Sequence, residues 1–434
     1  MDKNMIIALV RQEMMLAMGC TEPAASALAG AKARDIVAQF GQKIERAEIF
    51  ASRDLIKNAM SVGIPNCQLK GIQAAVALGI SGGSVADGLG ILSHITPSQI
   101  ESAKAVPISL SMVGDVPPLF VQVRVHTCDH IGEATIRDEH DHFSNLRLDG
   151  KLLQDDCSAH CEQRSASAGA KVLGSRQVSE ISLENIVEMA CAISEEEGSF
   201  LLDAVQTNLK IAEHGLSEEY GLCVGRTAMK DLHRNPTSLT EAFAVGAALA
   251  AAGSDARMAG CNLGVVINSG SGNQGLTVTV PVYIVAQYLK ASSLSLTRAL
   301  FISQCVALVL TACKDRLSAL CGAFTASIAT ACAYVYLLGG DCKVMDRAIN
   351  VMVGNLTGII CDGAKMTCPL KIHSSLDAAG LAVMIALEGH GPGSESGICG
   401  SDSLQAIRSL SRISTEGMEE TDKTILSIML EKSC

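Results

Sequence analysis

The stretch Gly358-Ile-Ile-Cys-Asp-Gly-Ala-Lys-Met-Thr-Cys-Pro-Leu-Lys-Ile-His373 places two cysteines in one short polar segment between apolar, helix-like sequences. Its glycines interrupt a helix, and Pro369 is expected to stop a helix from continuing through Cys368. We therefore predict that Cys361 and Cys368 lie on irregular backbone between buried elements. Soft metals are often bound in this way, by thiolates on a loop whose free N–H groups hydrogen-bond to sulfur.

The composition bounds the fold and the partners. The chain has 434 residues, of which 48% are hydrophobic but only 3% aromatic, so the core must be packed with small and aliphatic side chains. Such packing suits closely apposed helices, and the length allows two or three domains. The net charge of −11 leaves no basic face of the kind that nucleic-acid binding needs, so we expect no nucleic-acid partner.

The cysteines are numerous, 17 in all, but the N-terminal sequence is not a secretory signal, because its apolar run is short and broken by Arg11 and Glu13. We expect a cytoplasmic protein with reduced cysteines, most of which fill the core. The uncharged run Leu317–Gly340 is long enough to span a bilayer, but it contains several Ser, Thr and Gly residues and lacks flanking charge bias. A buried helix of a soluble enzyme, with no membrane partner, is the favoured interpretation.

The N-terminal region mixes helices and strands. Residues 4–18 suit a helix, and Gly19 can end it, so that Cys20 would lie at the N-terminus of the next helix, where the dipole favours a thiolate. A buried turn cysteine is the alternative. Residues 47–52 are predicted to form a strand that leads into a turn with Lys57 and Asn58, either substrate contacts or members of an ordinary solvated loop.

A small sheet is predicted further on, after helices at 70–80, 84–93 and 98–105. Its strands are 106–112, 119–126 and 133–137. This region is also rich in possible metal ligands: His126, Cys128, His130, His140, His142, Cys157, His160 and Cys161. The spacings match no standard zinc module, so an exposed polar face of a sheet is favoured over a metal site. His140 is retained as a possible acid–base group.

The remainder is predicted to be mainly helical, beyond a polar linker at 162–178. Apolar spacing predicts helices at 181–193, 199–214, 240–252, 295–313, 317–338 and 344–353, and two amphipathic helices within 401–431. The Gly-rich segment 268–275 precedes a helix that we expect to begin near Pro281. It offers exposed N–H groups that suit a carboxylate or a phosphate, and Arg257 could add a bidentate contact; a tight interhelical turn is the alternative.

We therefore predict an α+β fold with two domains. Residues 1–175 form a mixed α/β part with a small sheet, and residues 176–434 form a mostly helical part that carries Cys321, Cys361 and Cys368. The pocket is expected between them.

Several short motifs in the right order resemble the L-cysteine desulfidase family, which is distantly similar to the iron–sulfur L-serine dehydratases. The resemblance runs over essentially the whole chain, and it rests on Gly19-Cys-Thr-Glu-Pro23, Lys57-Asn58, Ser254-Asp-Ala-Arg257, Asn268-Ser-Gly-Ser-Gly-Asn-Gln-Gly275, Ser318-Ala-Leu-Cys321, Cys361-Asp-Gly-Ala-Lys365 and Cys368.

The resemblance implies an oxygen-labile [4Fe-4S] enzyme without pyridoxal phosphate, whose cluster is easily lost in air. It would eliminate sulfide from L-cysteine to give pyruvate and ammonia, so the implied partner is a small amino acid. L-Serine dehydration by the same chemistry is the nearest alternative, and a non-catalytic iron–sulfur or thiol-based sensor is an alternative of another class. A homo-oligomer, such as a dimer, is also expected.

The resemblance also implies roles for individual residues. Four cysteines compete for three cluster positions: Cys20, Cys321, Cys361 and Cys368. The serine dehydratases favour the last three, whereas the desulfidases count Cys20 as a ligand. Three thiolates leave one iron open as a Lewis acid. The candidates for the base that takes the α-proton are Lys365, His373, Lys57, His140 and Cys20. The residues expected to bind the substrate carboxylate are Arg257, Asn268, Ser269, Ser271, Gly272 and Asn273. Asn58 is expected to be a further substrate contact. In the serine dehydratases a terminal cysteine can occupy the open iron, so Cys434 is hypothesised to do the same.

Overall fold

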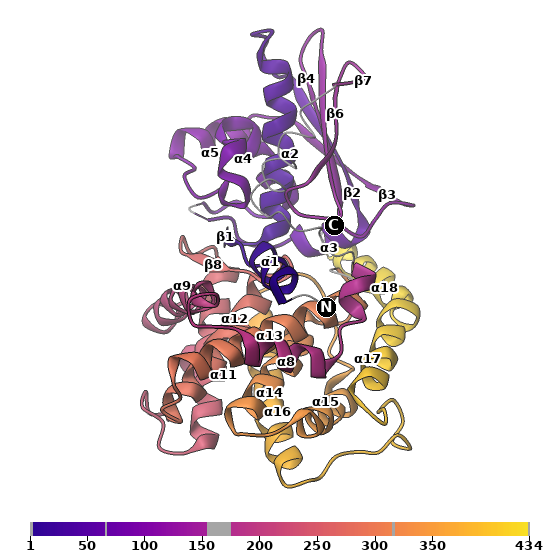
Figure 1. The fold of residues 1–434 in the computed structure, drawn as a ribbon. Helices are drawn as coiled ribbons and strands as arrows, with labels where there is room; N and C mark the ends of the chain where they lie inside the picture. The colour runs from indigo at the N-terminus through magenta and orange to yellow at the C-terminus, as the bar shows by residue number, and fades with distance from the viewer. Residues whose placement is uncertain (1–2, 66, 154–174, 315–316, 433–434) are drawn as a thin grey trace.

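The computed structural model describes residues 3–65, 67–153, 175–314 and 317–432. A sheet with its covering helices forms one end of the molecule, and a helical part forms the other (Figure 1). The predicted α+β class, with a small sheet in the N-terminal part and a mostly helical C-terminal part, is therefore confirmed.

The N-terminal part is built on a mixed six-stranded sheet. Its elements are α1 (Lys3–Glu13), β1 (Leu16–Met18), α2 (Thr21–Ala38), β2 (Arg46–Ser52), α3 (Arg53–Ala59), α4 (Gly71–Gly82), the 3₁₀ helix η1 (Val85–Gly90), α5 (Pro97–Lys104), β3 (Ile108–Val113), β4 (Phe120–His126), β5 (Ile131–Arg137), β6 (Phe143–Leu148) and β7 (Lys151–Leu152). The strand order is β3-β2-β4-β5-β6-β7, with β2 and β3 parallel and the other pairs antiparallel. The four predicted strands are confirmed, and β6 and β7 were not predicted.

Alternation along the strands decides which face of the sheet is covered. Val121, Val123 and Val125 of β4 are fully buried, and α2 packs over β4 and β5. The helix α4 packs in turn on α2, where a Cβ at Gly79 would collide with the Ala27 carbonyl. The small residues that dominate this region thus bring helices into close contact, as the composition predicts.

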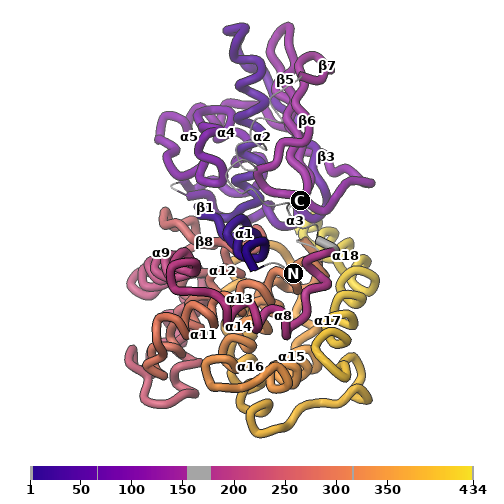
Figure 2. The backbone as a smooth tube through the Cα atoms, viewed as in Figure 1, coloured from indigo at the N-terminus to yellow at the C-terminus, as the bar shows by residue number. Residues whose placement is uncertain are grey.

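The helical part contains the elements α7 (Ser175–Ser179), α8 (Leu183–Ala192), α9 (Ser199–Ser217), α10 (Val224–Ala228), α11 (Leu239–Met258), β8 (Gly264–Val266), α12 (Gly272–Tyr288), α13 (Ser293–Lys314), α14 (Gly322–Leu337), α15 (Cys342–Leu356), α16 (Cys368–Leu387), α17 (Ser403–Arg412), the π-helical turn η2 (Ile413–Gly417) and α18 (Glu419–Glu431). Buried helices α11, α12, α14 and α16 pack against one another. The N-terminal α1 crosses over to this part and packs on α13 (Figure 2).

Two contacts connect the N-terminal part to the helical part. The strand β1 pairs with β8 in an antiparallel ribbon, with Leu16 opposite Val266. The last helix, α18, returns to pack on α3. The predicted domain boundary near residue 175 follows a segment outside the described residues, and it stays a prediction, as does most of the predicted linker.

The structure corrects three predictions of local structure. The first helix ends at Glu13, and residues 16–18 form β1, because their partner in β8 supplies the ladder hydrogen bonds. Pro369 lies in the first turn of α16, where a missing N–H costs nothing, so Cys368 begins a helix. Pro281 lies inside α12, and the Thr277 carbonyl that it leaves without a helical partner accepts a hydrogen bond from Thr330 Oγ1 at 2.8 Å.

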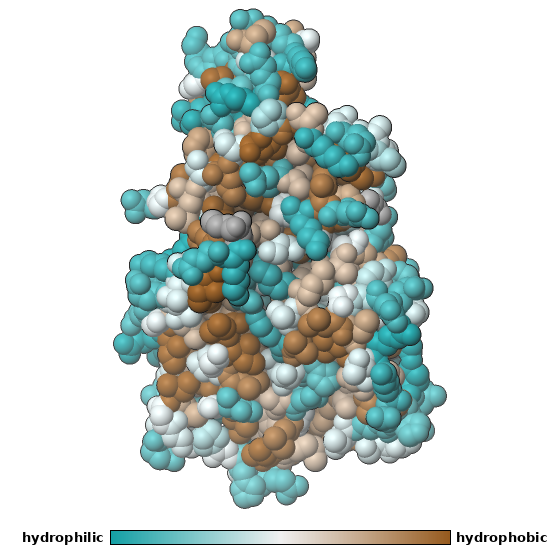
Figure 3. All heavy atoms as spheres, turned by 180° about the vertical axis from the view of Figure 1, so that it is seen from behind, coloured by the Kyte–Doolittle hydropathy of each residue, from teal (hydrophilic) through white to brown (hydrophobic). Residues whose placement is uncertain are grey.

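Within the described residues, two helices are long and apolar enough to cross a membrane, α13 and α16. A core helix of a soluble protein passes the same test, and 83% of the apolar window of α13 is buried within the fold. The run 317–340 forms the shorter helix α14, which is also buried. Seen from behind, apolar side chains are exposed in separate patches over the helical part (Figure 3).

Candidate active site

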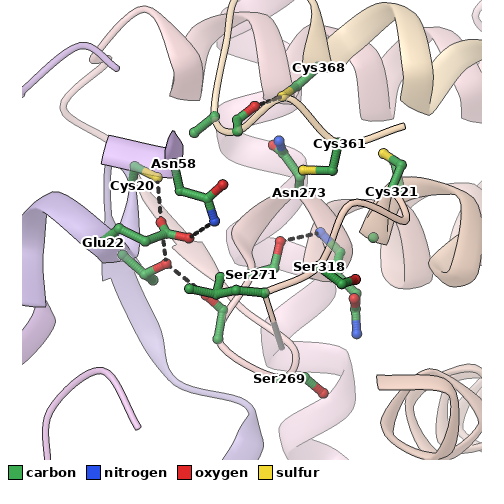
Figure 4. Close-up of a pocket in the computed structure, with 18 of the residues that line it drawn as sticks. Cys20, Glu22, Asn58, Ser269, Ser271, Asn273, Ser318, Cys321, Cys361 and Cys368 are labelled. Carbon is green, nitrogen blue, oxygen red and sulfur yellow. Dashed lines mark hydrogen bonds between the residues drawn. The ribbon is translucent and has the colours of Figure 1, made fainter. Parts of the chain in front are cut away.

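A cavity of about 100 Å³ lies at the junction of the two parts and receives side chains from both (Figure 4). Its residues from the N-terminal part are Cys20, Thr21, Glu22, Asn58 and His140. Those from the helical part include Arg257, Ser269, Ser271, Asn273, Gln274, Thr311, Lys314, Ser318, Cys321, Cys361 and Cys368. Polar and titratable groups therefore converge on a site that neither part could build alone.

Two of the cysteines are brought together by a short antiparallel bridge. The bridge pairs Leu320 with Ile360, and the N–H of Cys321 donates to Ile359 at 3.0 Å while the N–H of Cys361 donates to Ala319 at 2.6 Å. Residues 40 positions apart in the chain are thus held side by side. Cys321 is also the N-cap residue of α14.

The third cysteine, Cys368, faces the same cavity from the start of α16. The backbone N–H of Lys365 points at Cys368 Sγ from 3.4 Å. The loop that joins Cys361 to Cys368 turns at Gly363. Gly363 has a φ of 90°, and a Cβ there would collide with the Lys57 carbonyl. The backbone N–H groups near the sulfurs match the prediction made for the 358–373 stretch.

Burial opposes the ionisation of Cys321 and Cys368. Burial, with smaller contributions from the neighbouring Cys361 and Cys368, raises the pKa of Cys321 to about 12. Burial also raises the pKa of Cys368, again with a contribution from Cys361. The nearby ammonium group of Lys371 acts in the opposite direction on both. Three thiolates together would need a further cation to balance them.

Three cysteine thiols line the cavity: Cys321, Cys361 and Cys368. Among the described residues, no three Cys, His, Asp or Glu side chains converge closely enough to hold one metal ion. In a cluster each thiolate binds a different iron, so the sulfurs lie further apart than around one ion. Three cysteine thiols with backbone N–H groups nearby are the ligands that such a cluster uses.

The opposite wall is formed by the start of α2. Cys20 is its N-cap residue and donates through Sγ to Glu22 Oε2 at 2.8 Å. Asn58 Nδ2 donates to Glu22 Oε1 at 3.0 Å, and Thr21 Oγ1 lies 3.1 Å from Oε2. All of these side chains are buried.

This wall holds Glu22 ionised and Cys20 protonated. Burial by itself would raise the pKa of Glu22, but the electrostatic effects of His140 and Arg257 and the hydrogen bond from Cys20 lower it overall. Burial and the negative charge of Glu22 raise the pKa of Cys20 well above its ordinary value, against the effect of Arg257. At neutral pH, therefore, a thiol donates to a carboxylate here.

A tight turn before α12 forms the third side of the cavity. Ser269 and Gly270 have φ values of 49° and 80°, and the N–H groups of Asn268 and Ser271 donate to each other's carbonyls across the turn. Ser271 then caps α12 through the N–H of Gln274. The predicted tight turn and the predicted Gly-rich loop are thus one structure.

Arg257 lies behind this turn, in the last turn of α11, and is 3% exposed. A Cβ at Gly272 would overlap the guanidinium group, so only glycine lets α12 start so close to it. Arg257 Nε has no hydrogen-bond partner among the described residues. A buried cationic donor without an acceptor, at the wall of a cavity, suits an anionic ligand group.

Four helices begin at the cavity: α2, α12, α14 and α16. The residues at their starts include Cys20, Ser271, Cys321 and Cys368. Cys20 and Cys321 make no side-chain capping hydrogen bond. The positive ends of four helix dipoles therefore face one space, which favours negative charge there.

Of the predicted site residues, ten line the cavity: Cys20, Asn58, His140, Arg257, Ser269, Ser271, Asn273, Cys321, Cys361 and Cys368. Asn268 and Gly272 lie behind it. Asn268 is fully buried and links the turn to α13 by donating through Nδ2 to Gln304 Oε1 at 2.6 Å. Gly272 provides the close approach to Arg257 described above.

The three other base candidates do not line the cavity. Lys57 is fully buried and pairs with Asp422 of α18, with Asp54 3.9 Å away. His373 pairs with Asp377 one turn along α16, 3.0 Å away. Lys365 donates through Nζ to the Lys57 carbonyl at 3.1 Å, and burial lowers its pKa against the effect of Asp362.

Several cavity residues were not predicted: Thr21, Glu22, Gln274, Thr311, Lys314 and Ser318. For Glu22 a signal existed, since it is a lone charged residue at the start of a helix made of Ala, Ser, Gly and Leu. Thr311 and Lys314 lie at the polar end of the apolar helix α13, which long-range packing alone brings to the cavity.

The part of the ligand-rich sheet region that the structure describes holds no group of three side chains placed to bind a metal ion. His126 pairs with Glu48 at 3.1 Å, His130 pairs with Asp149 at 2.9 Å, and Cys128 is exposed. His140 alone among them lines the cavity. Cys157, His160 and Cys161 lie outside the described residues, and so does Cys434.

Comparison with known proteins identifies the family. The model of the serine dehydratase alpha chain matches residues 86–427. A UPF0597 protein of Oleidesulfovibrio alaskensis is 36% identical over 430 residues, covering 98% of this chain and 97% of the relative. A UPF0597 protein of Aeromonas hydrophila is 37% identical over 429 residues, covering 98% of this chain and 96% of the relative. A UPF0597 protein of Parabacteroides distasonis is 34% identical over 436 residues, covering 100% of this chain and 99% of the relative.

The chain therefore belongs to the serine dehydratase alpha-chain family. The expected kinship with the iron–sulfur L-serine dehydratases is confirmed at the level of the family. Membership indicates a lyase that acts on a small molecule. Cytoplasmic location and homo-oligomer formation stay predictions.

Proposed function

We propose that this protein is an iron–sulfur-dependent lyase that removes the β-substituent of a small L-amino acid, converting L-cysteine to pyruvate, ammonia and sulfide. One observation carries the proposal. The thiols of Cys321, Cys361 and Cys368 line the same cavity as Arg257 and the turn that precedes α12. Ligands for a metal cofactor and a binding site for a carboxylate thus face one space.

In this proposal Cys321, Cys361 and Cys368 hold a [4Fe-4S] cluster, and Cys20 is left for the reaction. When bound, a cluster with three protein ligands supplies an open iron that acts as a Lewis acid. Pyridoxal phosphate has no role. The three thiols are supported as ligands by the bridge at Leu320–Ile360 and by their common cavity.

The chain's own residues bind the substrate carboxylate. Arg257 Nε has a free donor, and the turn at 269–271 together with the start of α12 adds backbone N–H groups and the Ser271 hydroxyl. The amide of Asn273 is oriented there by Ser254 Oγ, which donates to its Oδ1 at 2.9 Å. A carboxylate in this place is bound by preorganised dipoles that need no rearrangement.

Cys20 is the best-supported group for giving a proton to the departing sulfide, because its thiol is protonated. It lines the cavity, whereas Lys57, Lys365 and His373 do not. Its hydrogen bond to Glu22 fixes the direction of the thiol. Elimination breaks the Cα–H bond and the Cβ–S bond: His140, the other candidate base that lines the cavity, takes the α-proton, sulfide leaves with the electron pair of the Cβ–S bond, and water then hydrolyses the resulting 2-aminoacrylate to pyruvate and ammonia.

L-Serine is the second candidate substrate, because the matching family model is that of a serine dehydratase. The choice of L-cysteine as the substrate rests on the resemblance to the L-cysteine desulfidases, which is carried by the Gly19–Pro23 motif and the cluster cysteines. The two reactions differ only in the leaving group, so relative turnover separates them.

The proposal is tested with protein purified without oxygen and reconstituted with iron and sulfide. We expect pyruvate and sulfide from L-cysteine, and slower or no pyruvate from L-serine. Pyruvate from L-serine alone would favour the dehydratase. Bound iron with no product from either amino acid would overturn the lyase proposal in favour of a sensor.

A further inference from the structure

The wall formed by Glu22 and Asn58 contains acceptor atoms that the reaction described above does not use. Glu22 is 7% exposed, and each of its contacts is with a hydrogen-bond donor: the Cys20 thiol, the Asn58 amide and the Thr21 hydroxyl. A carboxylate offers about four acceptor sites. Since Thr21 Oγ1 also lies 2.7 Å from the Gly270 carbonyl, at least one site on Glu22 is left.

Asn58 supplies a second acceptor. Its Nδ2 is used by Glu22, and its side chain is 7% exposed, but its Oδ1 accepts no hydrogen bond within the described residues. In Figure 4 the Asn58 amide has its nitrogen on Glu22 and its oxygen directed into the space in front of Cys361. A buried carbonyl oxygen without a donor costs free energy unless a ligand satisfies it.

The donors lie on other sides of the cavity. The free Nε of Arg257 and the starts of α12 and α14 all present N–H groups. The cavity is therefore polarised, with an anionic, acceptor-rich wall at α2 and α3 and a cationic, donor-rich wall at α11 and α12. A ligand that carries both an ammonium group and a carboxylate matches this arrangement.

We propose that Glu22 is a specificity-determining residue that, together with Asn58 Oδ1, binds the α-ammonium group of the substrate. An ammonium group has three donors, and the two acceptors satisfy two of them. The substrates are then free α-amino acids, and carboxylic acids without an amino group bind poorly. The inference rests on the proposed function, because it assigns a subsite within the same cavity.

A different role for Glu22 makes a different prediction. If Glu22 served only to receive a proton through Cys20, its charge would matter for turnover and not for the binding of an unreactive amino acid. L-Alanine and propionate separate the two roles, because neither has a leaving group and they differ only in the amino group.

The test measures binding of L-alanine and of propionate by titration calorimetry to the anaerobically reconstituted protein. Wild type should bind L-alanine at least about 10-fold more tightly than propionate. Glu22→Gln, which keeps the size but removes the charge, should weaken L-alanine binding about 10- to 100-fold, as expected for a hydrogen bond to a charged group, and leave propionate unchanged. Glu45→Gln, at an exposed acid of the same part, is the matched control.

Asn58→Leu is the second variant, in case Glu22→Gln does not fold. It removes the free acceptor and should weaken L-alanine binding about 5-fold or more without affecting propionate. Thermal unfolding and iron content verify that each variant is intact.

The results separate this inference from the proposed function. If wild type turns over L-cysteine but both variants bind L-alanine normally, the ammonium site is overturned and the lyase stands. The same holds if propionate binds as tightly as L-alanine. If wild type binds neither compound and turns over no amino acid, both proposals fail.

Discussion

Two regions of this molecule are rich in cysteine or histidine, and among the described residues only one of them brings several such side chains to one cavity. The sheet region carries eight such residues within positions 126–161. In the turn between β4 and β5, His130 pairs with Asp149 and Cys128 is exposed. The cavity wall draws Cys321, Cys361 and Cys368 from separate elements, and their thiols face one enclosed space.

The difference shows that the density of ligand-type residues along a chain is a weak signal. Alternation along a strand sends neighbouring side chains to opposite faces, so residues that are close in sequence need not meet. The short bridge at Leu320–Ile360 has the opposite effect, because it aligns two cysteines from distant segments at the starts of buried elements. Topology therefore decides which cysteines act together.

The sharpest way to break the comparison is to remove one cysteine from each region. Cys321→Ser, Cys361→Ser or Cys368→Ser should lower activity by at least about 100-fold. Mutating even a residue that only hydrogen-bonds to a metal ligand typically lowers metal affinity or activity about 10- to 100-fold, and a ligand should matter more. Iron content should fall together with the activity. Cys128→Ser, at the exposed cysteine of the sheet region, should change neither quantity.

The measurement is iron per chain and pyruvate formation after anaerobic reconstitution. Full iron content in all three cavity variants would contradict the assignment of the ligands. A loss of iron in Cys128→Ser would contradict the contrast between the regions.

The second prediction compares ion pairs. Lys57 and Asp422 are both buried and join α3 to α18 beside the cavity, whereas the His130–Asp149 pair is largely exposed. Lys57→Met should cost about 3–5 kcal/mol in the free energy of unfolding, because it leaves a buried charge without its partner. Asp149→Asn should change the free energy of unfolding far less, because solvent screens an exposed ion pair.

Chemical denaturation of both variants measures this difference. The double variant Lys57→Met/Asp422→Leu should recover most of the loss, since the uncompensated charge is gone. If Lys57→Met were as stable as Asp149→Asn, the pair would not hold the two parts together.

The third prediction concerns the donor wall. Arg257→Lys keeps the charge but loses the planar, forked donor, so we expect about a 10- to 100-fold rise in KM for the amino acid. Steady-state kinetics on the reconstituted protein provide the measurement. A drop in kcat at unchanged KM would instead place Arg257 outside carboxylate binding.

The smallest expected effect is a pH dependence of the free energy of unfolding that arises from Asp255. Burial raises the pKa of Asp255 to about 6 from its ordinary 3.8, against the effect of the Gly225 N–H. Between these values the native state binds more protons than the unfolded state, so the free energy of unfolding falls as pH rises. Relative to Asp255→Asn, wild type should lose on the order of 2 kcal/mol between about pH 4 and pH 7.

Denaturation at a series of pH values tests this. The sheet region offers a contrast of opposite sign, since the hydrogen bond with His130 lowers the pKa of Asp149. Parallel pH profiles for wild type and Asp255→Asn would contradict the effect of burial.

Local patterns in the sequence predicted much of this structure. The strands β2, β4 and β5 follow from alternation of buried and exposed residues, and most helices of the C-terminal part follow from apolar spacing. The errors arose where tertiary contacts override local preference. Pro281 is tolerated inside α12 because Thr330 of another helix satisfies the carbonyl that the proline leaves free.

The site was predictable to the extent that its residues lie in recognisable motifs. Arg257, the turn at 269–271 and the cavity cysteines were found in this way. Glu22 was missed although it lies in the Gly19–Pro23 motif, and Thr311 and Lys314 were missed because only the packing of α13 brings them to the cavity. Lys57 was predicted to be a substrate contact, a base or a member of a solvated loop, but the structure buries it against Asp422, a partner that no local pattern could reveal.

The most direct test of the central claim is the visible spectrum of the anaerobically reconstituted protein, with its iron and sulfide content, before and after addition of L-cysteine. The account predicts one [4Fe-4S] cluster per chain, an absorption band that shifts when L-cysteine binds, and no such cluster in Cys361→Ser. A protein that binds no iron, or whose iron absorption responds to neither L-cysteine nor L-serine, would contradict it.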